Sequence, residues 1–155
     1  MTELATAIAA YGQARRRQPP LKMVVEVYDM LLTLVNRARA ARIDGGRLTE
    51  VHTLSLVGRV LVALDGCLDR QDPRAQPLTR TLSAYYKGVL VQAHTAARSM
   101  GEPGLERYAS VYRQLLVMRN AWASVAGVAP LPTTIAKRDD QVPDTAREEP
   151  AEIAG

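Results

Sequence analysis

The chain has 155 residues, of which 47% are hydrophobic, 23% are charged and 5% are aromatic, and it contains no Phe. This length suits one domain with an aliphatic core, and no run of 18 apolar residues is free of charges, which argues against a membrane-spanning helix. The single Cys excludes an internal disulfide and fits a reducing cytoplasm, and the N-terminal arginines follow the weakly apolar stretch, unlike those of a secretory signal.

The net charge of +4 is unevenly distributed. Residues 1–136 carry 17 basic and 10 acidic side chains, a net charge of +7, whereas residues 137–155 carry 3 basic and 6 acidic ones, a net charge of −3. The only basic cluster is Arg15, Arg16 and Arg17. Such a cluster contacts nucleic-acid phosphates or anionic lipid in some proteins and is a solvated hinge in others. The other arginines are isolated along the chain, so we favour the hinge and expect no nucleic-acid partner.

Residues 1–18 form a short arm, and Pro19 and Pro20 then begin a helix predicted over residues 20–43, because Pro is favoured in a first helical turn. Asp44-Gly45-Gly46 ends it. Two apolar stripes run along this helix at helical spacing. The first consists of Leu21, Val24, Val25, Tyr28, Leu31, Val35 and Ala38, and the second of Met23, Val27, Met30, Leu34 and Ala41.

An ordinary surface helix buries only one apolar stripe. The second stripe therefore packs within the protein or faces a partner, and Met23, Val27, Met30 and Leu34 are the candidate partner-binding residues. From the residues alone, a homodimer and a groove for a helix of another protein explain this stripe equally well.

Three more helices are predicted, over residues 48–69, 75–100 and 105–126. The stripe of the second helix is Val51, Leu54, Val57, Leu61, Leu64 and Leu68, with Leu56, Val60, Ala63 and Cys67 on a neighbouring face. The stripe of the third is Leu78, Leu82, Tyr85, Val89, Ala93, Ala96 and Met100. Helices of this length joined by short connections predict an all-α, antiparallel up-and-down four-helix bundle over residues 19–127. The acidic, Pro-containing segment 128–155 is predicted to be a disordered tail.

No constellation of side chains indicates catalysis. His52 and His94 lack further ligands at metal-binding spacing, and Cys67 on an apolar face reads as a small buried hydrophobe with no base nearby. The carboxylates Asp65 and Asp69 lie one turn apart near a helix end, where solvated charges are the expectation. The sequence thus predicts a binding protein without metal or cofactor, and not an enzyme.

Four segments spread over about residues 8–126 share the order and spacing of one known pattern. In the opening segment, Pro20 lies eight residues before Tyr28-Asp29 and alanines follow at Ala38, Ala40 and Ala41. The others are Ile8 with Tyr11, then Leu82, Tyr85, Leu90 and Ala93, and finally Leu115, Leu116, Met118, Arg119, Ala121 and Trp122. With these segments the chain resembles the FliS flagellin export chaperones, and it departs from them at Met30, usually Gly, and Ser83, usually Tyr.

The resemblance implies a cytoplasmic chaperone that binds the C-terminal helical segment of flagellin, prevents premature polymerisation and hands it to the flagellar type III export gate. It also implies that Ile8 and Tyr11 cover the empty site and later contact the export gate. A FliS-like adaptor for another secreted client and a basic helical nucleic-acid-binding regulator stay as alternatives, as does a homodimer of the client-free chain.

Overall fold

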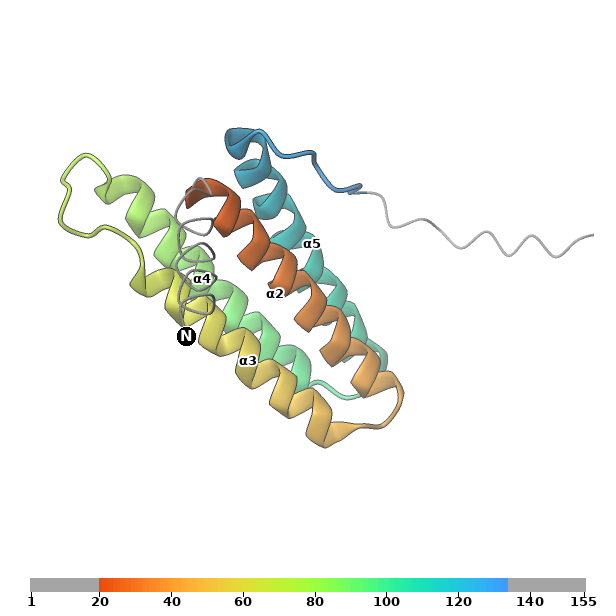
Figure 1. Ribbon diagram of the computed structural model, residues 1–155. Coiled ribbons are helices and arrows are strands. Elements are labelled where there is room, and N and C mark those ends of the chain that lie inside the picture. Colours follow the sequence, from red (N-terminus) through yellow and green to blue (C-terminus); the bar gives the residue numbers. More distant parts are fainter. Residues whose placement is uncertain (1–19, 134–155) are drawn as a thin grey trace, which may run out of the picture.

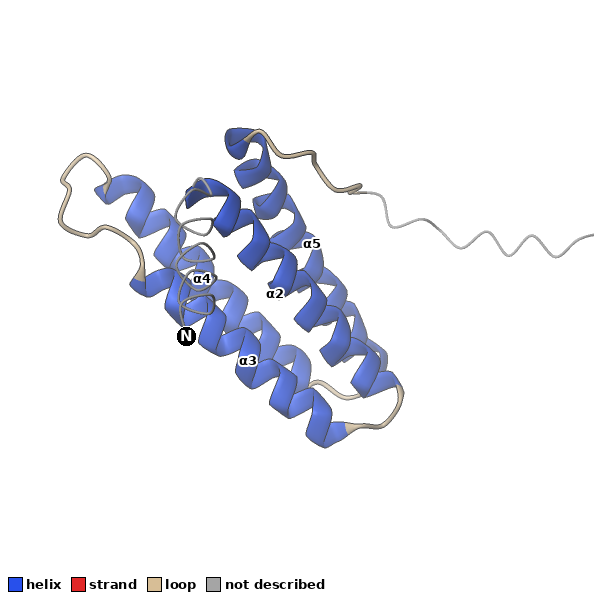
Figure 2. Ribbon diagram, viewed as in Figure 1, coloured by secondary structure: helices blue, strands red, loops and turns tan. Residues whose placement is uncertain are grey.

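A computed structural model describes residues 20–133 of the chain, and this part is helical without any strand. Its helices are α2 (Pro20–Ile43), α3 (Arg47–Gly66), α4 (Gln76–Arg98) and α5 (Gly101–Ala126). Consecutive helices run antiparallel, and each packs against two neighbours in the cyclic order α2, α3, α4, α5 (Figures 1 and 2). The predicted all-α four-helix bundle is confirmed.

The helix ends follow local chemistry. Pro20 is the first residue of α2, as predicted. Gly45 in the turn after α2 has φ of 74° and Gly127 after α5 has φ of 68°, a conformation that Gly adopts without the steric penalty of a Cβ. The predicted start of the last helix at residue 105 is too late, because α5 already begins at Gly101. Pro103 then lies in the first turn of α5, where a missing N–H leaves no helical hydrogen bond unmade.

The core is aliphatic, with tyrosines buried among small and branched side chains. Helix α2 contributes its first predicted stripe to this core, and Tyr28, Leu31 and Ala38 of that stripe are fully buried. Three residues assigned to core stripes are instead exposed, namely Val51, Leu78 and Met100. Val51 and Leu78 lie in the opening turns of α3 and α4, and Met100 lies between α4 and α5. Val51 directly follows the buried Glu50 and lies off the buried face of α3, whereas Leu78 and Met100 lie where α4 begins and just after it ends.

A buried ion cluster ties the helices together at the end of the bundle that carries the α2–α3 and α4–α5 turns. Glu50 of α3 is 1% exposed, and its Oε1 accepts a hydrogen bond from the Tyr108 hydroxyl of α5 at 2.6 Å. Arg42 Nη2 of α2 lies 2.8 Å from the same oxygen, and Arg47 Nη1 lies 3.0 Å from Oε2. Arg42 also donates to the carbonyl of Ala97 in α4 at 2.6 Å. All four helices therefore contribute to one polar network.

A second polar contact lies towards the opposite end and joins α2 to α5. Arg119 Nε donates to Asp29 Oδ1 at 2.8 Å, and its Nη1 donates to the carbonyl of Ala129 at 2.8 Å. Asn120 exchanges two hydrogen bonds with the backbone of Leu131, at 2.8 and 2.9 Å. The chain just past the predicted boundary at residue 127 is thus fixed on α5. Residues 134–155, the remainder of the predicted disordered tail, lie outside the described residues.

Candidate functional site

The second apolar stripe of α2 is only partly covered by the bundle. Met23 is 39% exposed and Met30 is 45% exposed, while Val27 between them and Leu34 one turn further on are half-buried. Ala41, the last member of the predicted stripe, is buried. The first stripe therefore supplies the core, and the second leaves methionine and branched side chains at the surface.

The ion pair of Asp29 decides which neighbour this stripe faces. Asp29 lies on the flank of α2 that contacts α5, since it pairs with Arg119. Met23, Val27, Met30 and Leu34, spaced at four, three and four residues, share one face that is well over 90° around the helix from Asp29. This face lies on the other flank of α2, towards α3.

Helix α3 presents a matching stripe of apolar side chains. A cavity between α3 and α4 is lined by Ser55, Gly58 and Val62, which fixes the flank of α3 that faces α4. The opposite flank, towards α2, carries residues at the same spacing of four, three and four, namely Leu56, Val60, Ala63 and Cys67. Leu56 and Val60 are half-buried, and Ala63 and Cys67 are exposed. We use the name α2–α3 groove for the apolar surface that these two stripes form along the junction of the two helices.

The chemistry of the α2–α3 groove suits binding. Its side chains are aliphatic or thioether groups, with one thiol, and the charged residues Lys22 and Glu26 lie outside the stripe on exposed positions of α2. Methionine side chains are flexible and polarizable, so they adapt to the surface of a bound apolar partner. Helix-in-groove recognition uses apolar surfaces of this composition, with anchors at helical spacing.

Several residues of α2, α4 and α5 that match the FliS-like pattern pack inside the bundle. Tyr28 and Ala38 are fully buried, and the Tyr28 hydroxyl donates to that of Tyr86 at 3.4 Å. Burial, together with this hydrogen bond, holds the pKa of Tyr28 above its usual value. The Tyr85 hydroxyl donates to the carbonyl of Gln114 at 3.1 Å, and burial raises the pKa of Tyr85 as well. Trp122 is half-buried against the core. Tyr28 and Tyr85 thus join helices inside the bundle, and Trp122 packs on its core.

The lid residues, the histidines and the cysteine named from the sequence are either exposed or lie outside the described residues. Ile8 and Tyr11, predicted to cover the site, lie outside the described residues. His52 and His94 are both exposed. The prediction that Cys67 is buried is wrong, because α3 ends at Gly66 and the Cys67 side chain is exposed beyond the last packed turn. In residues 20–133 no three His, Cys, Asp or Glu side chains are grouped closely enough to hold a metal ion.

Asp65 and Asp69 organise the connection between α3 and α4. Asp65 Oδ2 lies 2.9 Å from Arg70 Nη2, and the Asp69 carboxylate accepts backbone hydrogen bonds from Gln71 and Asp72. The nearby Ser83 hydroxyl and the Arg70 guanidinium hold the pKa of Asp65 below its usual value, although partial desolvation opposes them. Asp65 and Asp69 therefore stabilise the connection between α3 and α4.

The ion cluster around Glu50 had no counterpart in the sequence-based predictions. The only local signal is the spacing of Arg47 and Glu50, which are three residues apart on one helical face. Arg42 and Tyr108 come from other helices, and no sequence pattern pairs them with Glu50.

Comparisons of the chain with protein-family models, curated proteins and solved structures found no match. Of the helices described between residues 20 and 133, none has the length and apolar character needed to cross a membrane.

Proposed function

We propose that this protein is a cytoplasmic export chaperone that binds the C-terminal helical segment of flagellin in the α2–α3 groove. The observation that carries the proposal is the exposed second stripe of α2, with Met23 and Met30 at 39% and 45% exposure, beside the matching stripe of α3. The FliS-like pattern of Pro20, Tyr28-Asp29, Tyr85 and Trp122 supports the same assignment.

Binding alone accounts for the proposed activity. Segments that polymerise by packing amphipathic helices expose an apolar stripe until they assemble. The groove covers such a stripe by helix-in-groove contact, and occupancy lowers the concentration of segments free to polymerise by mass action. This action involves no bond cleavage, metal or nucleotide.

Calorimetry with the C-terminal segment of flagellin, about 40 residues long, tests the proposal directly. We expect a 1:1 complex with a clearly negative heat capacity of binding, because coupled folding of such a segment buries on the order of 1,000–3,000 Å². The variant Met30→Asp places a charge in the groove and should weaken binding at least ~10-fold, equivalent to ~1.4 kcal/mol. The matched control Val117→Asp adds the same charge at an exposed position of α5 and should change affinity by less than ~2-fold.

Two results would count against this assignment. If no flagellin segment binds, flagellin is not the client, and the proteins that co-purify from cytosol then identify any other secreted client. If Met30→Asp and Val117→Asp bind equally well, the client does not occupy the α2–α3 groove.

The N-terminal arm supplies the second part of the proposal. Ile8 and Tyr11 are three residues apart, so in a helical turn they lie on one face. Burying both side chains stabilises the covered groove by roughly 3–5 kcal/mol. Ordering the arm costs about 1–2 kcal/mol for each fixed residue. The remaining stabilisation is small, so a client can displace this lid. Once displaced, the arm contacts the export-gate protein.

Replacing Ile8 and Tyr11 with Ala tests the lid. The bundle should stay folded and client affinity should be equal or modestly higher, whereas flagellin secretion should fall. Loss of client binding with the fold intact would make the arm a primary client contact instead of a lid. Sedimentation of the client-free chain, with and without the substitution, separates lid formation from homodimerisation through the same groove.

A further inference from the structure

The charged side chains on the outward face of α4 are all positive. Residues 80, 84, 87, 91, 94 and 98 follow one face at helical spacing, and all are exposed. Arg80, Lys87 and Arg98 lie on this line, with His94 in the same row, and α4 contains no acidic residue at all. Because a helix rises 1.5 Å per residue, Arg80 and Lys87 are separated by about 10 Å along the helix axis.

Helix α3 extends this charge across the neighbouring surface. Arg59 is exposed and lines the cavity between α3 and α4 together with His94. Of the two acidic residues of α3, Glu50 is buried, and Asp65 is paired with Arg70 at 2.9 Å and lies close enough to Lys87 to interact with its charge. We call the surface of Arg59, Arg80, Lys87 and Arg98 the α3–α4 basic face. It lies on the flank of α3 opposite the α2–α3 groove.

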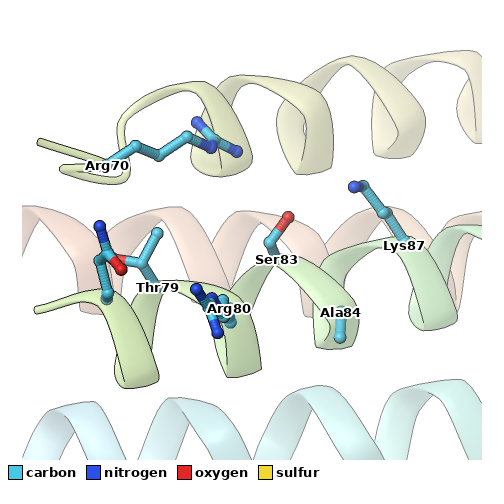
Figure 3. Close-up of a pocket in the computed structure, with 7 residues that line it drawn as sticks. Arg70, Thr79, Arg80, Ser83, Ala84 and Lys87 are labelled. Carbon is cyan, nitrogen blue, oxygen red and sulfur yellow. The ribbon is translucent and has the colours of Figure 1, made fainter.

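Two hollows lie along the α3–α4 basic face. The first, of about 470 Å³, is lined by Arg70, Arg80 and Lys87 and by the polar side chains of Gln76, Thr79 and Ser83. In Figure 3, Arg70 reaches in from the connection after α3, while Ser83 and Lys87 point towards it from α4. Because Arg70 is already paired with Asp65, Arg80 and Lys87 are the cationic groups that this hollow offers to a carboxylate, beside its polar side chains.

The second hollow adds an apolar component. It measures about 530 Å³ and is lined by Leu54, Val62 and Leu90 as well as by Arg59 and His94. Val62 is 63% exposed, and Val91 on the α4 line is 63% exposed too. The face therefore alternates positive charges with aliphatic side chains.

We infer that the α3–α4 basic face docks an acidic, amphipathic helical segment of a second protein partner. A helix lying along α4 with acidic residues at heptad spacing places its carboxylates opposite Arg80 and Lys87, and its apolar residues reach Val62 and Val91. Duplex nucleic acid fits less well, because its charge recurs every ~1.7 Å and exposed aliphatic side chains contribute nothing to phosphate contact. The acidic segment 134–155 of this chain matches the charge but has few large apolar residues.

Fluorescence anisotropy with the full-length chain tests the inference. The probe is a labelled synthetic helix of about three heptads, with Leu at the a and d positions and Glu at e and g. The full-length chain should bind this probe, with affinity falling as salt rises from ~0.05 to ~0.3 M because screening shortens the range of exposed charge interactions. The double variant Arg80→Glu with Lys87→Glu should weaken binding ~10-fold or more.

A matched control removes the same charge elsewhere. Arg39 and Arg107 are exposed on α2 and α5, so Arg39→Glu with Arg107→Glu should change affinity by less than ~2-fold. Val62→Asp should also weaken binding of the probe, because the new carboxylate interrupts the aliphatic contact and repels the glutamates of the probe. Circular dichroism confirms that each variant stays helical.

Several outcomes would overturn the inference. Equal binding of a probe with Lys in place of Glu would show that charge does not select the partner. Tighter binding of duplex DNA, with the same sensitivity to Arg80 and Lys87, would make this a nucleic-acid surface. Binding of the probe only after removal of residues 134–155 would assign the face to the chain's own tail. Loss of flagellin-segment binding in the double variant would place the client itself there.

Discussion

Neutralising Glu50 should clearly destabilise the bundle, because it leaves the charge of Arg42 without its partner. Replacing it with Gln keeps the shape of the side chain and removes the charge. In the native protein, Arg42 has a side-chain exposure of 12% and Glu50 of 2%, and their atoms lie 2.8 Å apart. After the substitution, Arg42 is left with neutral acceptors for a largely buried positive charge.

The expected loss follows from this burial. Removing one partner of a buried ion pair costs about 3–5 kcal/mol, and because Gln still accepts a hydrogen bond, we expect the lower end, about 3 kcal/mol. Small domains have a free energy of unfolding of about 5–15 kcal/mol, so the variant should remain folded but clearly weakened. With a urea dependence of about 1–3 kcal/mol per molar, the unfolding midpoint should fall by ~1–3 M.

The pH dependence provides a second measurement on the same pair of proteins. Burial raises the pKa of Glu50, but hydrogen bonds from Tyr108, Arg42 and Arg47 outweigh it and hold the pKa below the ordinary value of 4.5. A lowered folded-state pKa means that the stabilisation is complete above about pH 4.5 and is lost as the pH falls through the folded value. The stability difference between the native protein and Glu50→Gln should therefore narrow on acidification.

The matched control is Glu106→Gln. Glu106 pairs with Arg113 at 3.2 Å, but the two side chains are 70% and 50% exposed, so the loss should be ~0.2–1 kcal/mol. Urea unfolding followed by circular dichroism at neutral pH compares the two variants. If Glu50→Gln loses no more free energy of unfolding than Glu106→Gln, the buried cluster does not stabilise the bundle and the reasoning is wrong.

Further predictions concern sites along the rest of the chain. Gly104→Ala should destabilise the bundle by more than ~2 kcal/mol, because a Cβ would collide with a backbone carbonyl at the end of α4. Gly88→Ala, where a Cβ meets nothing within 4 Å, should instead stabilise it by ~0.5–1 kcal/mol; thermal melts of the two variants should move in opposite directions. Asp29→Asn should lower the free energy of unfolding by ~0.5–1.5 kcal/mol, because Arg119, which is 5% exposed, loses a counter-charge that is itself 43% exposed and partly screened, and an unchanged urea midpoint would contradict this. Removing residues 137–155 should leave the melting temperature within a few degrees and client binding unchanged, and a larger shift would mean that this segment is docked.

Much of the fold could be predicted because helical structure is encoded over a few neighbouring residues. The repeat of Tyr28, Leu31, Val35 and Ala38 identified the core face of α2, and Pro20 and the glycines after α2 and α5 marked helix ends, whereas Gly101 and Gly104 lie inside α5. The same periodicity identified Met23 and Met30 as a second stripe. It could not decide whether that stripe was covered, because exposure depends on how closely α3 packs beside it.

Only the tertiary structure decided which charges meet. Arg42, Glu50 and Tyr108 lie in three different helices, and their contact depends on the arrangement of the helices around the core. In the sequence, Arg59 and Arg80 are isolated polar positions, yet α3 and α4 are neighbours in the bundle and their outward faces bring these cations onto one surface. Periodicity gives the direction of a side chain around its own helix, whereas the choice of neighbouring helix is set by packing between segments far apart in the chain.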